Sequence, residues 1–123
     1  MSLPKENNTE PESESSLLPS MKGSLDYAIN YMKMNYQREL SLNEVASSVN
    51  LSPYYFSRIF KKYTGDNFSK FLLNIRIDKA KELLSDKSNS IKKVAYQVGF
   101  NDPNYFSKVF HSATGTKASE YKE

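Results

Sequence analysis

Two segments of the chain place polar and charged groups at the spacing of a helical face. Residues at offsets 0, 3, 4 and 7 lie on one side of an α-helix, so each segment predicts a continuous polar stripe. Both stripes combine hydrogen-bonding groups with one long cation near the helix start, as a helix that reads base edges in the major groove of DNA requires. The first stripe is Tyr54, Ser57, Arg58 and Lys61, and the second is Asn104, Ser107, Lys108 and His111.

The two stripes belong to an internal duplication. The segment SLNEVASSVNL (41–51) aligns with SIKKVAYQVGF (90–100), and one residue is then inserted in the second copy. After it, PYYFSRIFKKYTG (53–65) and PNYFSKVFHSATG (103–115) are identical at seven of thirteen positions. Each copy predicts a helix, a tight turn and a second helix, at about 41–64 and about 90–114, which is the layout of a helix-turn-helix unit.

Local signals fix the ends of these helices. Ser41 and Glu44 form a capping box at the start of the first copy. Asn50 and Gly99 occupy equivalent positions in the two turns, and Asn and Gly are the residues that tolerate left-handed backbone. Each second helix should begin with an N-cap residue followed by proline at the first helical position. These pairs are Ser52–Pro53 and Asp102–Pro103.

The remaining elements predict an all-α fold. A helix before the first copy carries the apolar stripe Leu25, Ala28, Ile29 and Met32. Residues 67–85 predict one long linker helix, with Arg76 in its middle in a structural ion pair. At ~1.5 Å per residue it would span about 25–30 Å, near the separation of successive major-groove faces. The second helices should bury Phe56, Ile59, Phe60 and Tyr63 in the first copy and Phe106, Val109, Phe110 and Ala113 in the second.

Composition and charge narrow the functional classes. The 123 residues contain no cysteine and one histidine, which excludes disulfides, thiolate metal sites, cysteine nucleophiles and His-pair metal motifs. The net charge of +3 averages two unlike segments. Residues 1–20 hold one lysine and four glutamates, whereas the rest holds 16 basic and 10 acidic residues. We expect residues 1–22 to be a disordered acidic tail or interdomain linker.

A solvated surface is the ordinary explanation for a polar helix face. Two faces repeated with the same cap, turn and cation position make that explanation weaker, because a solvated face needs no repetition. A helical protein-interaction module that kept the fold and lost DNA readout is the alternative function. An enzyme is not expected, because His111 has no partner constellation and no glycine-rich phosphate loop or spaced carboxylate pair is present.

The segment from about residue 24 to 121 resembles the DNA-binding domain of the AraC/XylS family of bacterial transcription regulators. The resemblance is carried by SLNEVASSVNLSPYYFSRIFKKYTG, by IRIDKAKELL in the linker, and by IKKVAYQVGFNDPNYFSKVF, which is similar to the family's most diagnostic second-unit signature. It implies a seven-helix domain over residues 23–123, with two helix-turn-helix subdomains joined by the long linker helix. The end of the chain departs from the family pattern, with Lys117 near the position of a proline and Lys122 after Tyr121.

The resemblance also implies a function and a set of contacts. The domain would bind promoter DNA sequence-specifically, as an activator that contacts RNA polymerase, through two recognition helices in successive major-groove faces. Family base contacts come from the first two turns of each recognition helix, and they fall here on Tyr54, Ser57, Arg58, Asn104, Ser107 and Lys108. The expected phosphate contacts are Ser52, Lys61, Lys62, Asn101 and His111.

The expected partners follow from this reading. They are double-stranded promoter DNA, RNA polymerase, and a sensor or receiver domain, if the segment is the C-terminal output domain of a larger sensor or response regulator. A short stand-alone regulator is the rival possibility. No cofactor, metal, membrane or small-molecule ligand is expected for this segment, and the expected location is the cytoplasm.

Overall fold

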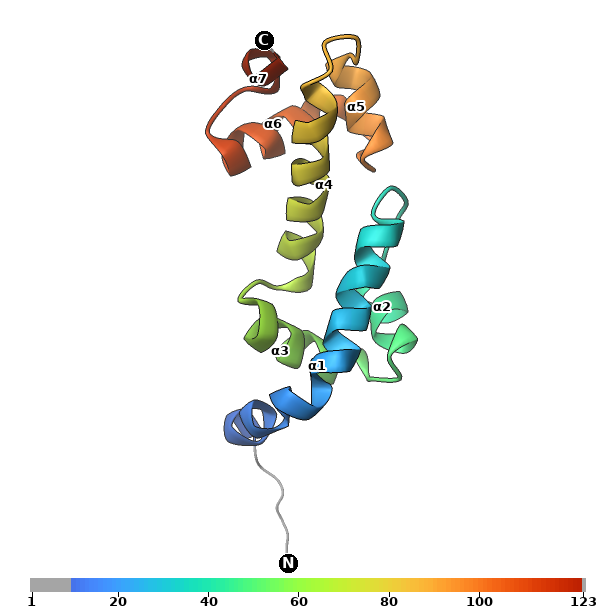
Figure 1. Ribbon diagram of the computed structural model, residues 1–123, viewed down its shortest axis with the longest axis vertical. Helices are drawn as coiled ribbons and strands as arrows, with labels where there is room; N and C mark the ends of the chain where they lie inside the picture. Colours follow the sequence, from blue (N-terminus) through green and yellow to red (C-terminus); the bar gives the residue numbers. More distant parts are fainter. Residues whose placement is uncertain (1–9, 123) are drawn as a thin grey trace, which may run out of the picture. The chain divides into compact units, whose positions relative to one another are not determined.

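The computed structural model describes residues 10–122, and all the regular elements in that part are α-helices (Figure 1). There are seven of them, which confirms the expected fold class. They are α1 (Glu10–Asn35), α2 (Leu42–Ser48), α3 (Pro53–Thr64), α4 (Phe68–Leu84), α5 (Ile91–Gln97), α6 (Pro103–Thr114) and α7 (Ala118–Lys122).

The chain divides into two compact units. Unit 1 comprises the described residues up to Met32 together with Ser41–Phe68, and unit 2 comprises Lys33–Leu40 together with the described residues from Ser69 onward. Each unit contains one copy of the duplication. The last turn of α1 and the loop after it therefore belong to the second unit, although they precede the first copy in the sequence.

Unit 1 is built on a small core of aliphatic and aromatic side chains. The Phe56 and Phe60 rings lie on one face of α3 with their centroids 5.2 Å apart, and the Phe68 ring lies 6.3 Å from that of Phe60. The apolar stripe of α1 is buried as predicted, apart from the half-buried Ile29. The fully buried residues of this unit are Leu25, Ala28, Met32, Val45, Ala46, Phe56, Ile59 and Phe60.

Unit 2 repeats this core with a chain of rings. Phe106 lies 5.2 Å from Phe100 and 5.7 Å from Phe110, and Phe110 lies 5.4 Å from Tyr121 of α7. The linker helix α4 adds Leu72, Ile77, Ala80 and Leu84 to the buried set. These ring contacts join the apolar side of α6 to Phe100 and to α7, and the polar stripe on its opposite side is exposed to solvent.

The two turns share one geometry. Asn50 has φ of 60° and Gly99 has φ of 105°, both in the left-handed region as predicted. The N–H of Leu51 donates to the carbonyl of Ala46 at 3.0 Å, and the N–H of Phe100 donates to the carbonyl of Ala95 at 2.9 Å. The chain therefore leaves the first helix of each copy in the same direction.

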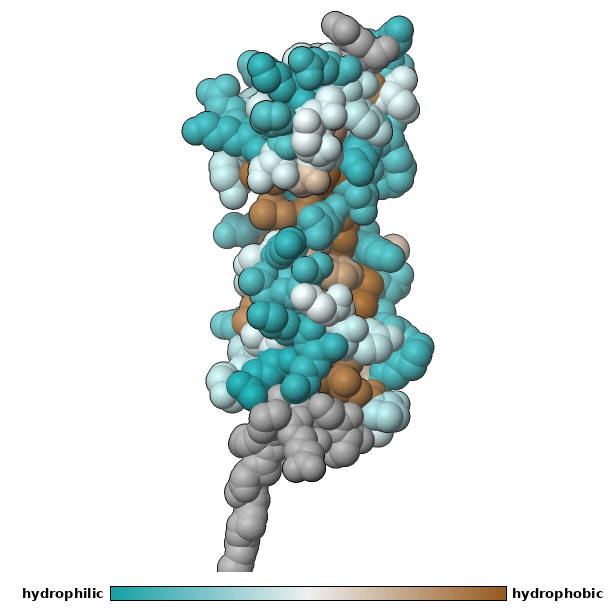
Figure 2. All heavy atoms as spheres, turned by 90° about the vertical axis from the view of Figure 1, so that its left-hand side faces the viewer, coloured by the Kyte–Doolittle hydropathy of each residue, from teal (hydrophilic) through white to brown (hydrophobic). Residues whose placement is uncertain are grey.

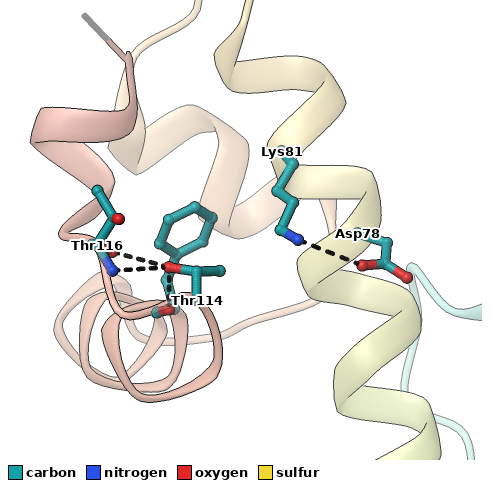
Figure 3. A network of polar contacts seen from close by, with 5 residues as sticks. Asp78, Lys81, Thr114 and Thr116 are labelled. Carbon is teal, nitrogen blue, oxygen red and sulfur yellow. Dashed lines mark hydrogen bonds and ion pairs between the residues drawn. The ribbon is translucent and has the colours of Figure 1, made fainter.

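The second helices also end alike. Thr114 Oγ1 lies 2.9 Å from the Phe110 carbonyl oxygen and 3.0 Å from that of Thr116, and it accepts the Thr116 N–H at 3.1 Å (Figure 3). Thr64 Oγ1 makes the same three contacts, with Phe60 and with Asp66. A threonine before the final glycine thus closes both helices by tying the last turn to the chain beyond it.

Arg76 corrects one expectation from the sequence. Its guanidinium is bound to backbone carbonyls and not to a carboxylate: Nε donates to Tyr36 O at 2.9 Å and Nη2 donates to Arg38 O at 3.0 Å. It also lies 5.9 Å from the centroid of the Phe100 ring, within the range of a cation–π contact. Burial lowers the pKa of the guanidinium, which nonetheless stays charged at neutral pH. Arg76 thereby holds the loop after α1 within unit 2.

Two other expectations differ from the structure. Ala113, predicted to be buried, is exposed, and Val109 is only half-buried. Residues 10–22, predicted to be part of a disordered tail, lie in α1, whose glutamate, leucine and methionine residues favour helix. The rest of that predicted tail, residues 1–9, lies outside the described residues. No helix in the part of the chain described here has the length and apolar character needed to cross a membrane.

Gly99 and Gly115 allow a matched test of close packing. A Cβ at Gly99 would lie 2.7 Å from Tyr36 O and 2.9 Å from Arg76 Nε, whereas a Cβ at Gly115, with φ of 79°, would meet nothing within 4 Å. We expect Gly115→Ala to lower the free energy of unfolding by about 1 kcal/mol, the cost of left-handed backbone alone. Gly99→Ala should cost about 3 kcal/mol, because overlap adds to that strain. Urea denaturation would measure both losses. Equal losses in the two variants would contradict the close packing of Tyr36 and Arg76 against Gly99.

Candidate nucleic-acid interface

The polar stripe of the first copy lies on the outer side of α3. Ser52, Tyr54, Lys61 and Lys62 are exposed, and Ser57 and Arg58 are half-buried. Ser57, Arg58, Lys61 and Lys62 line one hollow of about 560 Å³, together with Gly65. The sequence of α3 contains no acidic residue. The hollow is therefore lined by three cationic side chains and one hydroxyl group, which suits an anionic ligand.

The start of α3 is fixed by its cap. Ser52 Oγ accepts the N–H of Tyr55 at 3.2 Å, and Pro53 occupies the first helical position. The capped first turn places Tyr54 and Arg58 one helical turn apart on the outer side. Arg58 Nη1 lies 3.4 Å from Tyr54 Oη, and Arg58 Cζ lies 5.6 Å from the centroid of the Tyr54 ring.

Two tyrosines bind α1 to the helices of the first copy. The Tyr63 hydroxyl donates to Asp26 Oδ1 at 2.6 Å, and Lys22 Nζ donates to Asp26 Oδ2 at 2.7 Å. The Tyr31 hydroxyl donates to Glu44 Oε2 at 2.7 Å. The hydrogen bonds from Lys22 and then Tyr63 lower the pKa of the Asp26 carboxyl, and the bond to Asp26 raises the pKa of the Tyr63 phenol. Tyr63 was predicted as a core residue, but it is half-buried and serves as an anchor between helices.

The polar stripe of the second copy lies on the outer side of α6. Asn104, Ser107, Lys108 and His111 are all exposed. Asp102 caps this helix, since its Oδ1 accepts the N–H of Asn104 at 2.9 Å. A smaller hollow of about 280 Å³ is lined by Ile91, Ser107, Lys108, His111, Lys117, Ala118 and Ser119.

Lys117 and Ser119 are candidate site residues that the sequence reasoning missed. They stand at and near the start of α7 and line the hollow beside His111 and Lys108. The sequence did contain a signal for them: a glycine at the end of α6 favours a left-handed turn, and such a turn at Gly115 redirects the chain just before Lys117. Asn101 is another of the residues expected to contact phosphate. It lines other hollows with Arg76, Gly99 and Phe100 and not the one beside α6.

The structure thus brings most of the predicted residues into two clusters, one on each unit. Ser57, Arg58, Lys61 and Lys62 gather beside α3, and Ser107, Lys108 and His111 gather beside α6. Most of the surface drawn in Figure 2 is hydrophilic, with hydrophobic side chains showing in limited patches between. Among the described residues, no group of three or more histidine, aspartate or glutamate side chains is placed to hold a metal.

Comparisons with known proteins place the chain in a family of similar sequences. The sequence profile of a family described as a helix-turn-helix domain matches residues 45–123. The regulatory protein PocR of Salmonella typhimurium is 38% identical over 96 residues, which are 78% of this chain and 32% of that protein. The lactose operon transcription activator of Staphylococcus xylosus is 35% identical over 98 residues, which are 80% of this chain and 35% of that protein. The chain therefore spans about a third of the length of these curated relatives.

A solved structure shares the fold at a similar level of identity. The C-terminal domain of AraT, a response regulator from Geobacillus stearothermophilus, matches with a TM-score of 0.76 and 34% identity. The match covers 80% of this chain and 83% of that one.

The Asp26 contacts predict a specific acid dependence of stability. Because the pKa of Asp26 is lowered in the folded state, its contribution is present above its unfolded pKa of about 4 and is lost as the pH falls through the folded value. We expect the melting temperature of Asp26→Asn to fall less steeply than that of the unmodified chain as the pH is lowered below about 4. Tyr63→Phe, which keeps the ring and removes one hydrogen bond, should flatten it less. Identical acid limbs for Asp26→Asn and the unmodified chain would show that these contacts do not form in solution.

Proposed function

Because the chain belongs to the AraC-type helix-turn-helix family, we propose that it binds double-stranded promoter DNA sequence-specifically and regulates transcription as an activator. The observation that carries this proposal is the repetition of one device. In both units a capped helix, set by a left-handed turn, presents a polar stripe in the same register with a cation one turn from its start. A merely solvated surface would not need the cap, the turn and the cation to recur together.

The proposed mechanism places α3 and α6 in successive major-groove faces. Their first two turns would read base edges through Tyr54, Ser57, Arg58, Asn104, Ser107 and Lys108. Phosphates would be held by Ser52, Lys61, Lys62, Asn101 and His111. Lys117 is a further candidate, since it lines the same hollow as Lys108 and His111. Exposed N–H groups at a helix start carry partial positive charge, which favours a phosphate beside each cap.

We further propose the regulatory setting of this segment. The AraT domain that shares its fold is the C-terminal domain of a response regulator, and the Staphylococcus relative is a transcription activator. These likenesses support an output role in the bacterial cytoplasm, with an upstream sensor or receiver domain and with RNA polymerase as a partner. The length of the native open reading frame would decide between an output domain and a stand-alone regulator.

Selection of bound sequences from a random DNA library tests the function directly. We expect a motif with two half-sites about 10 bp apart, one for each recognition helix. A single short box would mean that only one unit reads bases. Equal binding to selected and random DNA would reduce the proposal to non-specific binding. No mobility shift at low salt, together with co-purification of a protein partner, would favour the interaction module instead.

Replacement of the two stripe cations near the helix starts should change specificity. Arg58→Ala and Lys108→Ala should each weaken binding to the selected site by about 1–3 kcal/mol and relax the preference at one base pair, because each removes a donor to a base edge. Competition titrations against sites changed at single positions would measure both effects. Unchanged site preference in Arg58→Ala would show that this residue does not read bases.

Replacement of the later cations should change affinity without changing specificity. Lys61→Gln should weaken binding to all sequences alike and reduce the slope of log K against log salt by about 1, because one phosphate contact and its released counterion are lost. Lys33→Gln removes one positive charge outside the two stripes and is the matched control. A salt slope that falls equally in both variants would point to net charge and not to a phosphate contact.

A further inference from the structure

A hollow of about 690 Å³ lies between the linker helix α4 and the helix α6 of unit 2. Its apolar lining comes from Leu73 and Ile77 on α4 and from Val109 and Ala113 on α6. Val109 is half-buried and Ala113 is exposed, although both stand on the side of α6 that its helical periodicity predicts to be buried. This hollow, the α4–α6 groove, therefore presents apolar surface of unit 2 to solvent.

The internal repeat shows how unit 1 covers the equivalent side of α3. Ile59 stands at the position equivalent to Val109 and is fully buried. Tyr63 stands at the position equivalent to Ala113, and its hydroxyl donates to Asp26 Oδ1 of α1 at 2.6 Å. In unit 1, therefore, an aromatic side chain of the protein itself crosses from the second helix of the copy to the helix that precedes the copy.

The linker helix α4 has in unit 2 the place that α1 has in unit 1. Each helix precedes one copy of the duplication and buries an apolar triplet at offsets 0, 3 and 7. The triplets are Leu25, Ala28 and Met32 in α1 and Ile77, Ala80 and Leu84 in α4. The side chain of Ala113 ends at its Cβ, so it cannot reach α4 as Tyr63 reaches α1. The α4–α6 groove thus lies where unit 2 lacks an aromatic ring that unit 1 has.

The charge around the groove indicates what kind of segment would supply such a ring. Lys70 of α4 and Lys108 of α6 line it, together with the amide of Asn74 and the hydroxyl of Ser112. No acidic side chain is among the described residues that line it. An aromatic side chain flanked by aspartate or glutamate complements both the apolar lining and the cations. A DNA backbone offers the negative charge without the apolar group and matches the groove less well.

We propose that the α4–α6 groove docks a protein segment that presents an aromatic side chain beside acidic residues. The ring packs against Leu73, Ile77 and Val109, and the acidic neighbours of the ring face the lysines. Aromatic anchors seated in pockets supply a large part of the binding energy of many protein interfaces. The inference goes beyond the proposed DNA-binding function, because it assigns unit 2 an interaction surface outside the polar stripe of α6.

Peptides of defined composition test the occupant, with the methyl NMR signals of the groove as the readout. One peptide has a central phenylalanine flanked by aspartates and glutamates. Two matched peptides carry alanine in place of the phenylalanine, or lysines in place of the acidic residues. We expect the first peptide to bind with a Kd on the order of 1 mM and to shift the methyl signals of Leu73, Val109 and Ala113. Each matched peptide should bind about tenfold more weakly or worse.

The substitution Ala113→Tyr fills the groove from within the chain. It copies the residue that unit 1 has at this position, so its melting temperature should be no lower than that of the unmodified chain. It should weaken binding of the phenylalanine peptide about tenfold or more. Gln97→Tyr adds a tyrosine at an exposed position of α5 outside the groove and should leave peptide binding unchanged. Ala113→Tyr should also retain binding to the selected DNA site, because Ala113 lies outside the polar stripe.

Three outcomes would overturn the docking inference. Equal binding of the phenylalanine peptide and its alanine counterpart would mean that charge alone drives association. Full affinity of folded Ala113→Tyr for the phenylalanine peptide would place that peptide elsewhere on the chain. Unchanged methyl signals with all three peptides at about 10 mM would show that the groove docks no such segment. If Ala113→Tyr does not fold, the three peptides on the unmodified chain still decide. Failure to select a DNA motif would overturn only the proposed function, since peptide docking does not depend on DNA.

Discussion

One residue in left-handed backbone sets the direction of the second helix in each unit. Asn50 and Gly99 let the chain reverse within a few residues, and the bonds to the carbonyls of Ala46 and Ala95 hold that reversal. The buried alanines leave room for the next helix to cross closely above. This turn orients the whole of the second helix, including its cap, its buried phenylalanine face and its outward polar stripe. If α3 or α6 followed the turn at another angle, it would bury a different side.

Features that depend on neighbouring residues were predictable from the sequence, and long-range contacts were not. The caps at Ser41 and Ser52 and the turn at Asn50 are encoded within four residues of where they act. Arg76 instead meets carbonyls 38 and 40 residues away, and no local pattern distinguishes a carbonyl partner from a carboxylate. Helical periodicity likewise predicted Tyr63 and the equivalent Ala113 to be buried, but Tyr63 is half-buried and Ala113 is exposed. Tyr63 has a side chain long enough to reach Asp26 on another helix, whereas Ala113 does not.

The candidate interface shows how a weakly basic protein concentrates its charge. The net charge of +3 would give little attraction to a polyanion if it were spread evenly. In the structure, cations without acidic neighbours on the same helix line a hollow beside α3 and another beside α6. Surface pairs elsewhere, such as Lys22 with Asp26 and Lys79 with Glu82, neutralise cations outside these stripes. Local placement of charge therefore carries more information than the total.

The close packing of Tyr36 and Arg76 against Gly99 makes the turns of the two copies unequal. Copying the turn of the second repeat into the first amounts to Asn50→Gly at an exposed site, which left-handed backbone accepts readily. The reverse copy, Gly99→Asn, would drive a Cβ into Tyr36 O and Arg76 Nε. The two turns therefore differ in the side chains they can accept, because only the second is closed over by the Tyr36 carbonyl and the Arg76 guanidinium.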